Sequence, residues 1–242
     1  MGKEEKVINF FVLCTRLKDV IRTGWLDWNV QRERIESVAE HIFSTQILAI
    51  AMKSEYQYDV DILKVIYMLA IHELGETIIG DITLFEMSRE EKEKIEHQAV
   101  HEILGGLLDG KYIEELFLEF DAHKTKEAMF AYMCDKLQCD LMSKMYDEEN
   151  CVDLNDQENN ATFKDEKVQK LLKDGYTWSG MWMKFGQDRY PYDDNFRKVS
   201  NYAFNNDISC YKKEVLEEVE EELKDIGPSL IKKDCSWSDY LD

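Results

Sequence analysis

Four side chains of the kinds that bind divalent cations stand out along the chain: His41, His72, Glu73 and Asp135. They fall on three separate segments, and each segment reads as a helix. Two imidazoles and two carboxylates suit a borderline or hard divalent cation such as Mn, Fe, Co, Zn or Mg. They also leave coordination positions open for water and a phosphate oxygen. The residue types therefore predict a metal site that supports metal-assisted hydrolysis.

The residues that follow His72 include a candidate acid/base group, Glu76, in addition to the candidate metal ligands. Adjacent helical residues differ by about 100°, so His72 and Glu73 can share one ion only near a helix end or a distortion. Gly75 supplies a reason for one. Glu76 lies one turn from His72 on the same face, where its carboxylate can accept a proton from attacking water or donate one to the leaving oxygen.

Plainer interpretations compete with this one. A lone histidine on an apolar helix face is more often a hydrogen-bonded core residue than a ligand, and a glutamate is usually solvated. The order of several motifs along the chain favours the metal site. No motif surrounds the other histidines, so we interpret them as surface or packing residues, and we expect two glutamates of a charge run to lie on a solvated helix face: His97, His101, His123, Glu93 and Glu96.

Long helices must position these groups. The chain has 2 prolines and 11 glycines, too few for the turns of a β-rich fold. Capping boxes predict helices that begin at Ser37 and Ser88 and reach about residues 53 and 108. Apolar periodicity predicts further helices over 7–21, 61–71 and 125–146. The fold class is therefore all-α.

Charge and composition exclude several classes of protein. The formal net charge of −20 would repel a nucleic acid, and no basic groove offsets it. An anionic substrate must therefore be neutralised locally, by a cation and a few arginines. The 6 cysteines form no CxxC pair, which indicates reduced thiols and a cytoplasmic protein. No apolar run reaches the roughly 20 residues that span a bilayer, so we expect no membrane partner.

The amino-acid composition of the chain changes after residue 146. Polar stretches at 147–150 and 155–160 predict linkers, which divides the chain into a bundle over 1–150 and a helical extension over 151–242. Residues 163–204 are rich in aromatic side chains that would not remain solvated, so they should pack on the bundle or on a partner subunit. We expect a homodimer on this ground, a short acidic helix over 211–224, and disorder in the last dozen residues.

Four motifs together resemble a known family. They are Arg22-Thr23-Gly24-Trp25, Glu36-Ser37-Val38-Ala39-Glu40-His41, His72-Glu73-Leu74-Gly75-Glu76 with Gly80-Asp81, and Cys134-Asp135-Lys136-Leu137. Their order and spacing over about the first 150 residues resemble the HD-domain phosphohydrolases, and most closely the 5'-deoxynucleotidase branch. The resemblance implies an HD-type helical bundle in which His41, His72, Glu73 and Asp135 bind one divalent metal ion. It further implies that Glu76 is the acid/base residue, that Asp81 positions water or substrate, that Arg22 meets the phosphate, and that Trp25 lies near the substrate pocket.

Two departures from the family pattern affect the site. The usual His-Asp pair is His72-Glu73 here, and the longer arm moves the carboxylate outward by roughly one C–C bond. Glu73 then either ligates the metal or supports a three-residue site from outside. A basic residue that often follows Gly-Asp is also absent from residues 83–87. We therefore expect phosphate contacts from Arg22, Arg32, Arg34 or Lys136.

Three functions are compatible with these residues. The first is a phosphohydrolase that removes phosphate from a (deoxy)nucleoside 5'-monophosphate. The second is a degenerate HD module that binds nucleotide or metal for regulation, which the His72-Glu73 pair favours and the presence of Glu76 and Asp81 disfavours. The third, a structural helical protein, leaves the ligand set unexplained.

Overall fold

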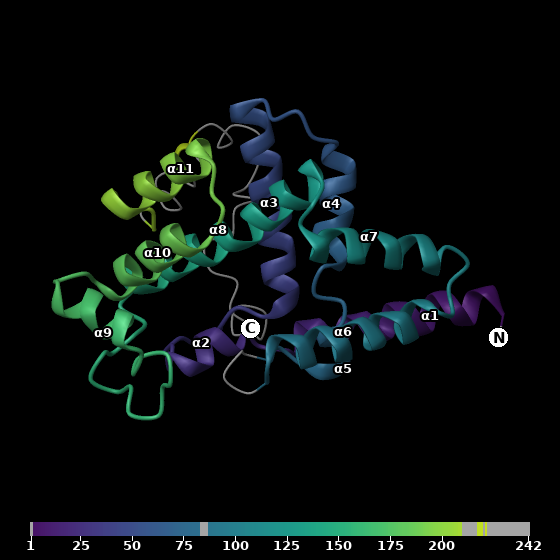
Figure 1. The fold of residues 1–242 in the computed structure, drawn as a ribbon, viewed down its shortest axis with the longest axis horizontal. Helices are drawn as coiled ribbons and strands as arrows, with labels where there is room; N and C mark the ends of the chain where they lie inside the picture. Colours follow the sequence, from purple (N-terminus) through teal and green to yellow (C-terminus); the bar gives the residue numbers. More distant parts are fainter. Residues whose placement is uncertain (1, 83–86, 210–216, 220, 222–242) are drawn as a thin grey trace.

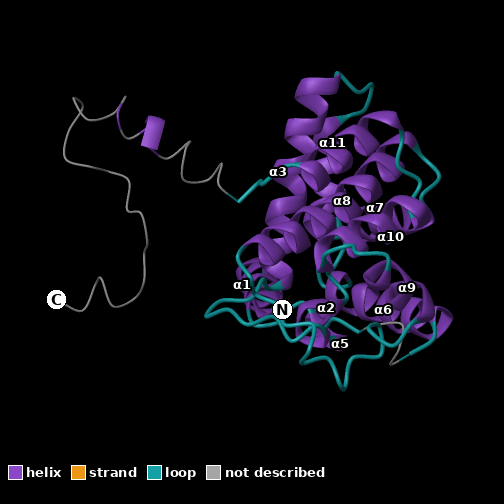
Figure 2. Ribbon diagram, turned by 90° about the vertical axis from the view of Figure 1, so that its left-hand side faces the viewer, coloured by secondary structure: helices purple, strands orange, loops and turns teal. Residues whose placement is uncertain are grey.

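The computed structural model describes residues 2–82, 87–209, 217–219 and 221, and within these residues the chain forms helices and no strand (Figures 1 and 2). The all-α prediction is confirmed. The α-helices are α1 (Lys3–Cys14), α2 (Thr23–Asp27), α3 (Val38–Tyr56), α4 (Ile62–Ile71), α5 (Glu76–Ile79), α6 (Arg89–Leu104), α7 (Gly110–Ala122), α8 (Lys126–Glu148), α9 (Glu166–Lys173), α10 (Trp178–Arg189) and α11 (Asp194–Asn205). A short 3-10 helix, η1 (Thr15–Lys18), follows α1.

Helix α8 is the centre of the molecule. Figure 1 shows it crossing the middle of the fold, in contact with α3, α4 and α7 on one side and with α10 and α11 on the other. Its buried Leu137 joins a core that includes Leu69 of α4 and Phe117 of α7. Because α8 is buried along most of its length, its polar residues that face inward are held in fixed positions.

The capping signals fix where the long helices begin. The Ser37 side chain accepts a hydrogen bond from the Glu40 backbone N at 3.3 Å, and the Glu40 carboxylate accepts one from the Ser37 backbone N at 2.8 Å. Ser88 and Glu91 form the same box at the start of α6. Both capping-box predictions are confirmed. The first predicted helix differs, since α1 begins earlier than residue 7 and gives way to η1 after Cys14.

Some of the aromatic residues after the linkers are buried within this chain, whereas others are partly buried and Tyr202 is 54% exposed. Trp178 and Phe196 are 1% and 0% exposed, and both belong to cores shared with the first 150 residues. The premise of the homodimer prediction, an exposed aromatic face, therefore holds only for part of these residues, and the homodimer stays a prediction. The division at residue 150 also stays a prediction. The predicted acidic helix over 211–224 and the last dozen residues lie outside the described residues, except 217–219 and 221.

Within the described part of the chain, no helix is both long and apolar enough to cross a membrane.

A tight turn joins the helix that precedes His72 to the helix that follows it. Helix α4 ends at Ile71, the residues from His72 to Gly75 form turns, and α5 begins at Glu76. Gly75 has an ordinary helical φ of −58°, so its backbone conformation does not require glycine. A Cβ there would lie 2.5 Å from Cγ of Glu96 on α6 and 3.3 Å from its backbone O. Glycine is needed because α6 approaches the turn so closely.

We expect Gly75→Ala to lower the free energy of unfolding by roughly 1–3 kcal/mol, because an added methyl group must push α6 away from the turn. Thermal denaturation of the metal-free protein measures this. Gly24→Ala is the matched control, since a Cβ at Gly24 meets only Trp182 Cη2 at an ordinary 3.7 Å. An equal loss in both variants would contradict the close-approach explanation.

Candidate metal centre

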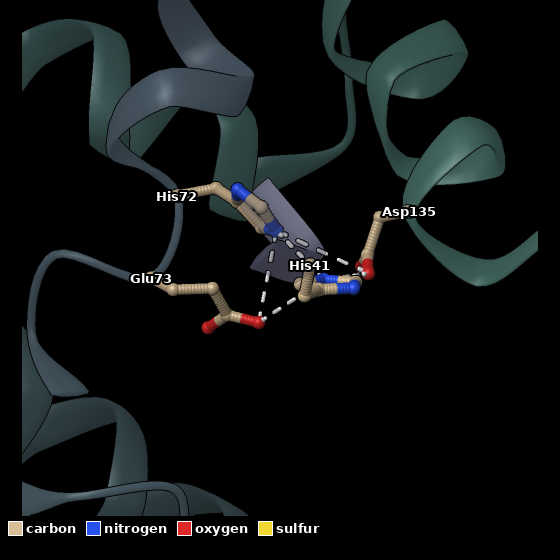
Figure 3. A group of neighbouring side chains, drawn as sticks. All are labelled: His41, His72, Glu73 and Asp135. Carbon is tan, nitrogen blue, oxygen red and sulfur yellow. Dashed lines mark hydrogen bonds and ion pairs between the residues drawn. The ribbon is translucent and has the colours of Figure 1, made fainter. Parts of the chain in front are cut away.

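The four predicted ligands converge on one point, from three separate helical segments (Figure 3). His41 lies in the first turn of α3, His72 and Glu73 follow the end of α4, and Asp135 lies in the middle of α8. One ligand atom from each residue lies within 4.8 Å of the others. The turn after Ile71 explains how the adjacent His72 and Glu73 face the same point. The longer arm of Glu73 reaches as well, since its Oε1 lies 3.6 Å from His72 Nε2 and 3.8 Å from His41 Nε2.

The hydrogen bonds of the two imidazoles fix which ring nitrogen faces the site. His41 Nδ1 lies 2.6 Å from the Gln138 side-chain oxygen, and His72 Nδ1 lies 2.8 Å from the Leu69 carbonyl oxygen. Both oxygens only accept, so both Nδ1 atoms carry a proton, and in the neutral form each imidazole then presents the lone pair of Nε2 to the site. The two Nε2 atoms are 3.3 Å apart.

Two lone pairs at this separation repel each other unless a cation lies beside them. The carboxylate of Asp135 also requires a cation nearby, because its Oδ1 is buried without a hydrogen-bond partner and lies 3.1 Å from His41 Nε2. Burial alone would raise the pKa of Asp135, but the charge of Lys136 holds that pKa well below its usual value. Asp135 is therefore a carboxylate. Two neutral imidazoles and two carboxylates are a donor set that fits a divalent metal ion.

A buried chain of hydrogen bonds positions His41 from behind. The Gln138 side-chain nitrogen donates to Glu36 Oε1 at 2.7 Å, and the Trp25 indole nitrogen donates to Glu36 Oε2 at 2.9 Å. Because the Glu36 carboxylate can only accept, it turns the amide nitrogen of Gln138 toward itself and the amide oxygen toward His41. Glu36 thus orients His41, a predicted metal ligand, through Gln138.

Replacing Gln138 by leucine is expected to weaken divalent metal binding roughly 10–100-fold, since His41 loses the acceptor that fixes its Nδ1 proton. Calorimetric titration with Mn²⁺ measures the affinity. Gln187→Leu is the control, because Gln187 on α10 bonds to Ser200 and Asn201 and not to the ligand group. Unchanged affinity in Gln138→Leu would show that the relay does not act on the metal.

Two further carboxylates lie beside the ligand group. Glu76 is 1% exposed, its Oε1 lies 3.5 Å from Lys92 Nζ, and its Oε2 is buried with no hydrogen-bond partner. Burial first, and then the charges of Glu73 and Asp81, raise the pKa of Glu76 well above its usual value. Asp81 accepts a hydrogen bond from the Thr23 backbone N at 2.8 Å. A buried carboxyl group with a raised pKa has the properties of a group that takes up and returns a proton.

The ligand group opens onto a cavity of about 510 Å³ whose wall carries both signs of charge. Carboxylates line it together with four cationic side chains, Arg22, Lys92, Lys136 and Arg189. Arg22 Nη1 lies 3.1 Å from Glu73 Oε1 and 3.7 Å from Asp81 Oδ2, and Lys136 Nζ lies 2.7 Å from Asp135 Oδ2. Arg22 and Lys136, two of the predicted phosphate contacts, thus lie at the cavity wall, where a bound anion could contact them.

Three other predicted site residues lie elsewhere. Arg32 and Arg34 line a separate pocket, where they form ion pairs with Glu149 and Glu40. Their expected contact with phosphate is not supported, because these pairs hold them in the loop before α3 and neither lines the cavity. Trp25 does not line the cavity either. It is 2% exposed and packs among Tyr146, Trp178 and Trp182, so its link to the site runs through Glu36.

The structure adds residues that the sequence reading left out. Lys92 reaches the cavity from α6 and donates to the Ile82 carbonyl oxygen at 2.9 Å, so a basic side chain that we did not predict lies at the cavity. Glu96, one turn further, lines the same cavity, and burial, followed by Glu73, raises its pKa to about 7. The expectation of a solvated Glu96 is therefore wrong. Lys92 and Glu96 are four residues apart, as expected of two residues on one helix face. Because most of their neighbours in the sequence are also charged, the sequence does not distinguish these two from the solvated residues.

The remaining histidines divide into two groups. His97 and His101 pair with Asp121 and Glu114 at 2.9 and 3.0 Å, away from the ligand group, as expected of surface residues. His123 lines the cavity, with its ring 3.8 Å from that of Tyr132.

Comparison with known proteins agrees with this geometry. A family model described as HD domain matches residues 14–174. The chain is 32% identical over 150 residues to "5'-deoxynucleotidase HDDC2" of Dictyostelium discoideum, covering 59% of this chain and 78% of that protein. It is 32% identical over 155 residues to "5'-deoxynucleotidase hdd1" of Schizosaccharomyces pombe, covering 61% and 75%. A solved structure, a predicted metal-dependent phosphohydrolase from Magnetospirillum magnetotacticum MS-1, has the same fold, with a TM-score of 0.55, 21% identity, and coverage of 83% of this chain and 89% of that one.

Proposed function

Because this chain belongs to the HD-domain family of phosphohydrolases, we propose that it hydrolyses nucleoside 5'-monophosphates, deoxynucleotides first, with one divalent metal ion. The proposed ligands are His41, His72, Glu73 and Asp135. The metal is Mn, Co, Fe, Zn or Mg. The substrate class rests on the two relatives named 5'-deoxynucleotidase.

One observation carries the proposal. Two imidazole nitrogens with outward lone pairs, 3.3 Å apart, face two carboxylates at the wall of a cavity that also holds Arg22 and Lys136. A cation at the ligand group would neutralise the carboxylates that otherwise repel a phosphate. Arg22 and Lys136 then donate hydrogen bonds to the negatively charged phosphoryl oxygens.

The side chains divide the work of hydrolysis among them. A bound divalent cation supplies Lewis acidity toward the phosphoryl oxygens and lowers the pKa of water. Glu76 takes the proton of the attacking water as the new P–O bond forms, and returns it to the 5' oxygen as the old P–O bond breaks. Asp81 helps to position the water or the substrate, and Arg22 stabilises the charge that develops on the phosphoryl group. The products are a nucleoside and inorganic phosphate.

The alternative, a degenerate HD module that binds nucleotide or metal for regulation, has less support. It rests on glutamate in place of aspartate at position 73, and the Glu73 carboxylate does reach both histidines. A binding module also has little need of the buried, partly unpartnered Glu76.

A screen of nucleoside mono-, di- and triphosphates against several divalent cations tests the proposal. We expect phosphate release from monophosphates that requires added metal and stops with a chelator. The His72→Ala variant, purified in the same way, controls for a contaminating phosphatase. Metal binding without phosphate release from any substrate would favour the regulatory module.

A further inference from the structure

A second, mostly apolar pocket adjoins the proposed catalytic cavity. It has a volume of about 200 Å³, its apolar wall consists of Trp28, Trp182, Phe185 and Tyr190 with Val168 and Met181, and Asp165 and Arg189 also line it. We call it the aromatic pocket. Arg189 and Tyr190 line both this pocket and the cavity that holds the ligand group. The two hollows are therefore neighbours that share a wall.

Two lines of contact connect the aromatic pocket to the metal ligands. Tyr190 lies under Lys136, whose Nζ is 6.0 Å from the ring centroid and 2.7 Å from Asp135 Oδ2. On the other side, Trp182 lies against the segment that carries Arg22. Its ring centroid is 5.1 Å from that of Trp25, and a Cβ on Gly24 would be 3.7 Å from its Cη2. A ligand with its phosphate beside Arg22 and Lys136 thus has the aromatic pocket next to it.

We propose that the aromatic pocket binds the nucleobase of the substrate, and that Arg189 lies between the base and the phosphate. This inference rests on the proposed function and adds a binding subsite to it. The pocket is smaller than the roughly 300–1,000 Å³ usual for whole ligands, so it suits one part of a ligand. Trp182, Phe185 and Arg189 lie on α10 and Tyr190 follows its end, so this part of the pocket lies outside residues 14–174, whereas Trp28 and Val168 lie within them.

The chemistry of the wall favours a flat, uncharged ring. Aromatic side chains stack on nucleobases of any sequence, whereas a charged group would lose its hydration against this apolar wall. Trp182, Phe185 and Tyr190 are each only partly buried, so their rings are accessible. The guanidinium carbon of exposed Arg189 lies 5.7 Å from the Phe185 ring centroid. A cation at this position can face a base on one side and a phosphate on the other.

The test compares Phe185→Ala with the wild-type protein on two substrates, deoxyadenosine 5'-monophosphate and 2-deoxyribose 5-phosphate, which lacks the base. We expect the variant to raise KM for the nucleotide about tenfold, since one stacking ring is lost, and to leave KM and kcat for the sugar phosphate unchanged. Phe185→Leu keeps an apolar group of similar bulk and should show the same loss, which separates stacking from folding. Equal effects on both substrates, or no effect on either, would overturn the proposal.

Phe204→Ala is the matched control, because Phe204 is a half-buried phenylalanine on α11 that does not line the aromatic pocket. A second readout does not depend on turnover. Deoxyadenosine without phosphate should quench the fluorescence of Trp28 and Trp182 in the wild type and in Phe204→Ala, and do so only at about tenfold higher concentration in Phe185→Ala. If the wild type releases no phosphate from any nucleotide, the proposed function fails, and this titration alone decides the subsite. Absence of binding to the wild type, or equal binding to Phe185→Ala, would refute the subsite.

Discussion

Glu76→Gln is expected to keep its metal and to lose turnover, with kcat for a deoxynucleoside 5'-monophosphate falling roughly 10²–10⁴-fold. The amide has the shape of the carboxyl group but cannot exchange a proton with water or with the leaving oxygen. Burial and two neighbouring carboxylates raise the pKa of Glu76 well above its usual value, which suits a group that takes up and returns a proton. Phosphate release with saturating Mn²⁺ measures kcat, and elemental analysis measures the bound metal.

The control for this variant is Glu115→Gln, the same change at an exposed position on α7 that does not line the cavity. It should retain wild-type values of kcat and KM. Full activity of Glu76→Gln would contradict the assignment of Glu76 as the acid/base residue. Loss of metal from Glu76→Gln would instead identify Glu76 as a ligand, and the four-residue ligand set would have to be revised.

The helices that carry the predicted metal ligands could be predicted because their signals are local. The capping box at Ser37 fixes the start of α3 and so places His41 in the first turn. Asp61 caps α4 by accepting from the backbone N atoms of Leu63 and Lys64. Each of these signals depends on residues within one turn of each other, so they can be recognised in sequence without knowledge of the tertiary fold.

Helix α7, in contrast, was not predicted from the sequence. Its buried residues Ile113, Leu116, Phe117 and Phe120 have helical spacing, yet we predicted no helix between residues 108 and 125. Both ends lack the usual local signals, since Asp109 makes no side-chain cap and the helix ends at His123 with a positive φ. The helix therefore depends on packing against α8, a contact that sequence periodicity shows only in part.

Placement of the charged and aromatic residues around the site could not be read from the sequence. Arg32 is a plausible phosphate ligand by residue type, but its ion pair with Glu149 draws it to another pocket. Arg189 and Tyr190 reach the cavity only because α10 packs along the second half of α8, where Gly186 allows the carboxylate of Asp140 to approach closely. Side-chain position across the fold depends on such long-range packing, which no local pattern encodes.

His72→Ala is expected to abolish stoichiometric metal binding together with activity. The loss should exceed the roughly 10–100-fold effect of disturbing a group behind a ligand, because the variant removes a donor atom itself. In the wild type, Mn²⁺ at about 100 times its dissociation constant should stabilise the fold by about 2.7 kcal/mol, seen as a rise in Tm. The variant should show no such rise. Metal content after dialysis and the Tm with and without Mn²⁺ measure both effects.

Metal content and Tm together separate ligation from folding. Loss of the buried His72 side chain, which is 4% exposed, also removes core packing and lowers the Tm of the metal-free protein. Only ligation, however, predicts that the response to Mn²⁺ disappears. His101→Ala is the control, since His101 is exposed on α6 and pairs with Glu114, and it should keep both the metal and the response. Retention of one Mn²⁺ per chain by His72→Ala would contradict the proposed centre, because the remaining three side chains would then suffice without the nitrogen that faces His41 at 3.3 Å.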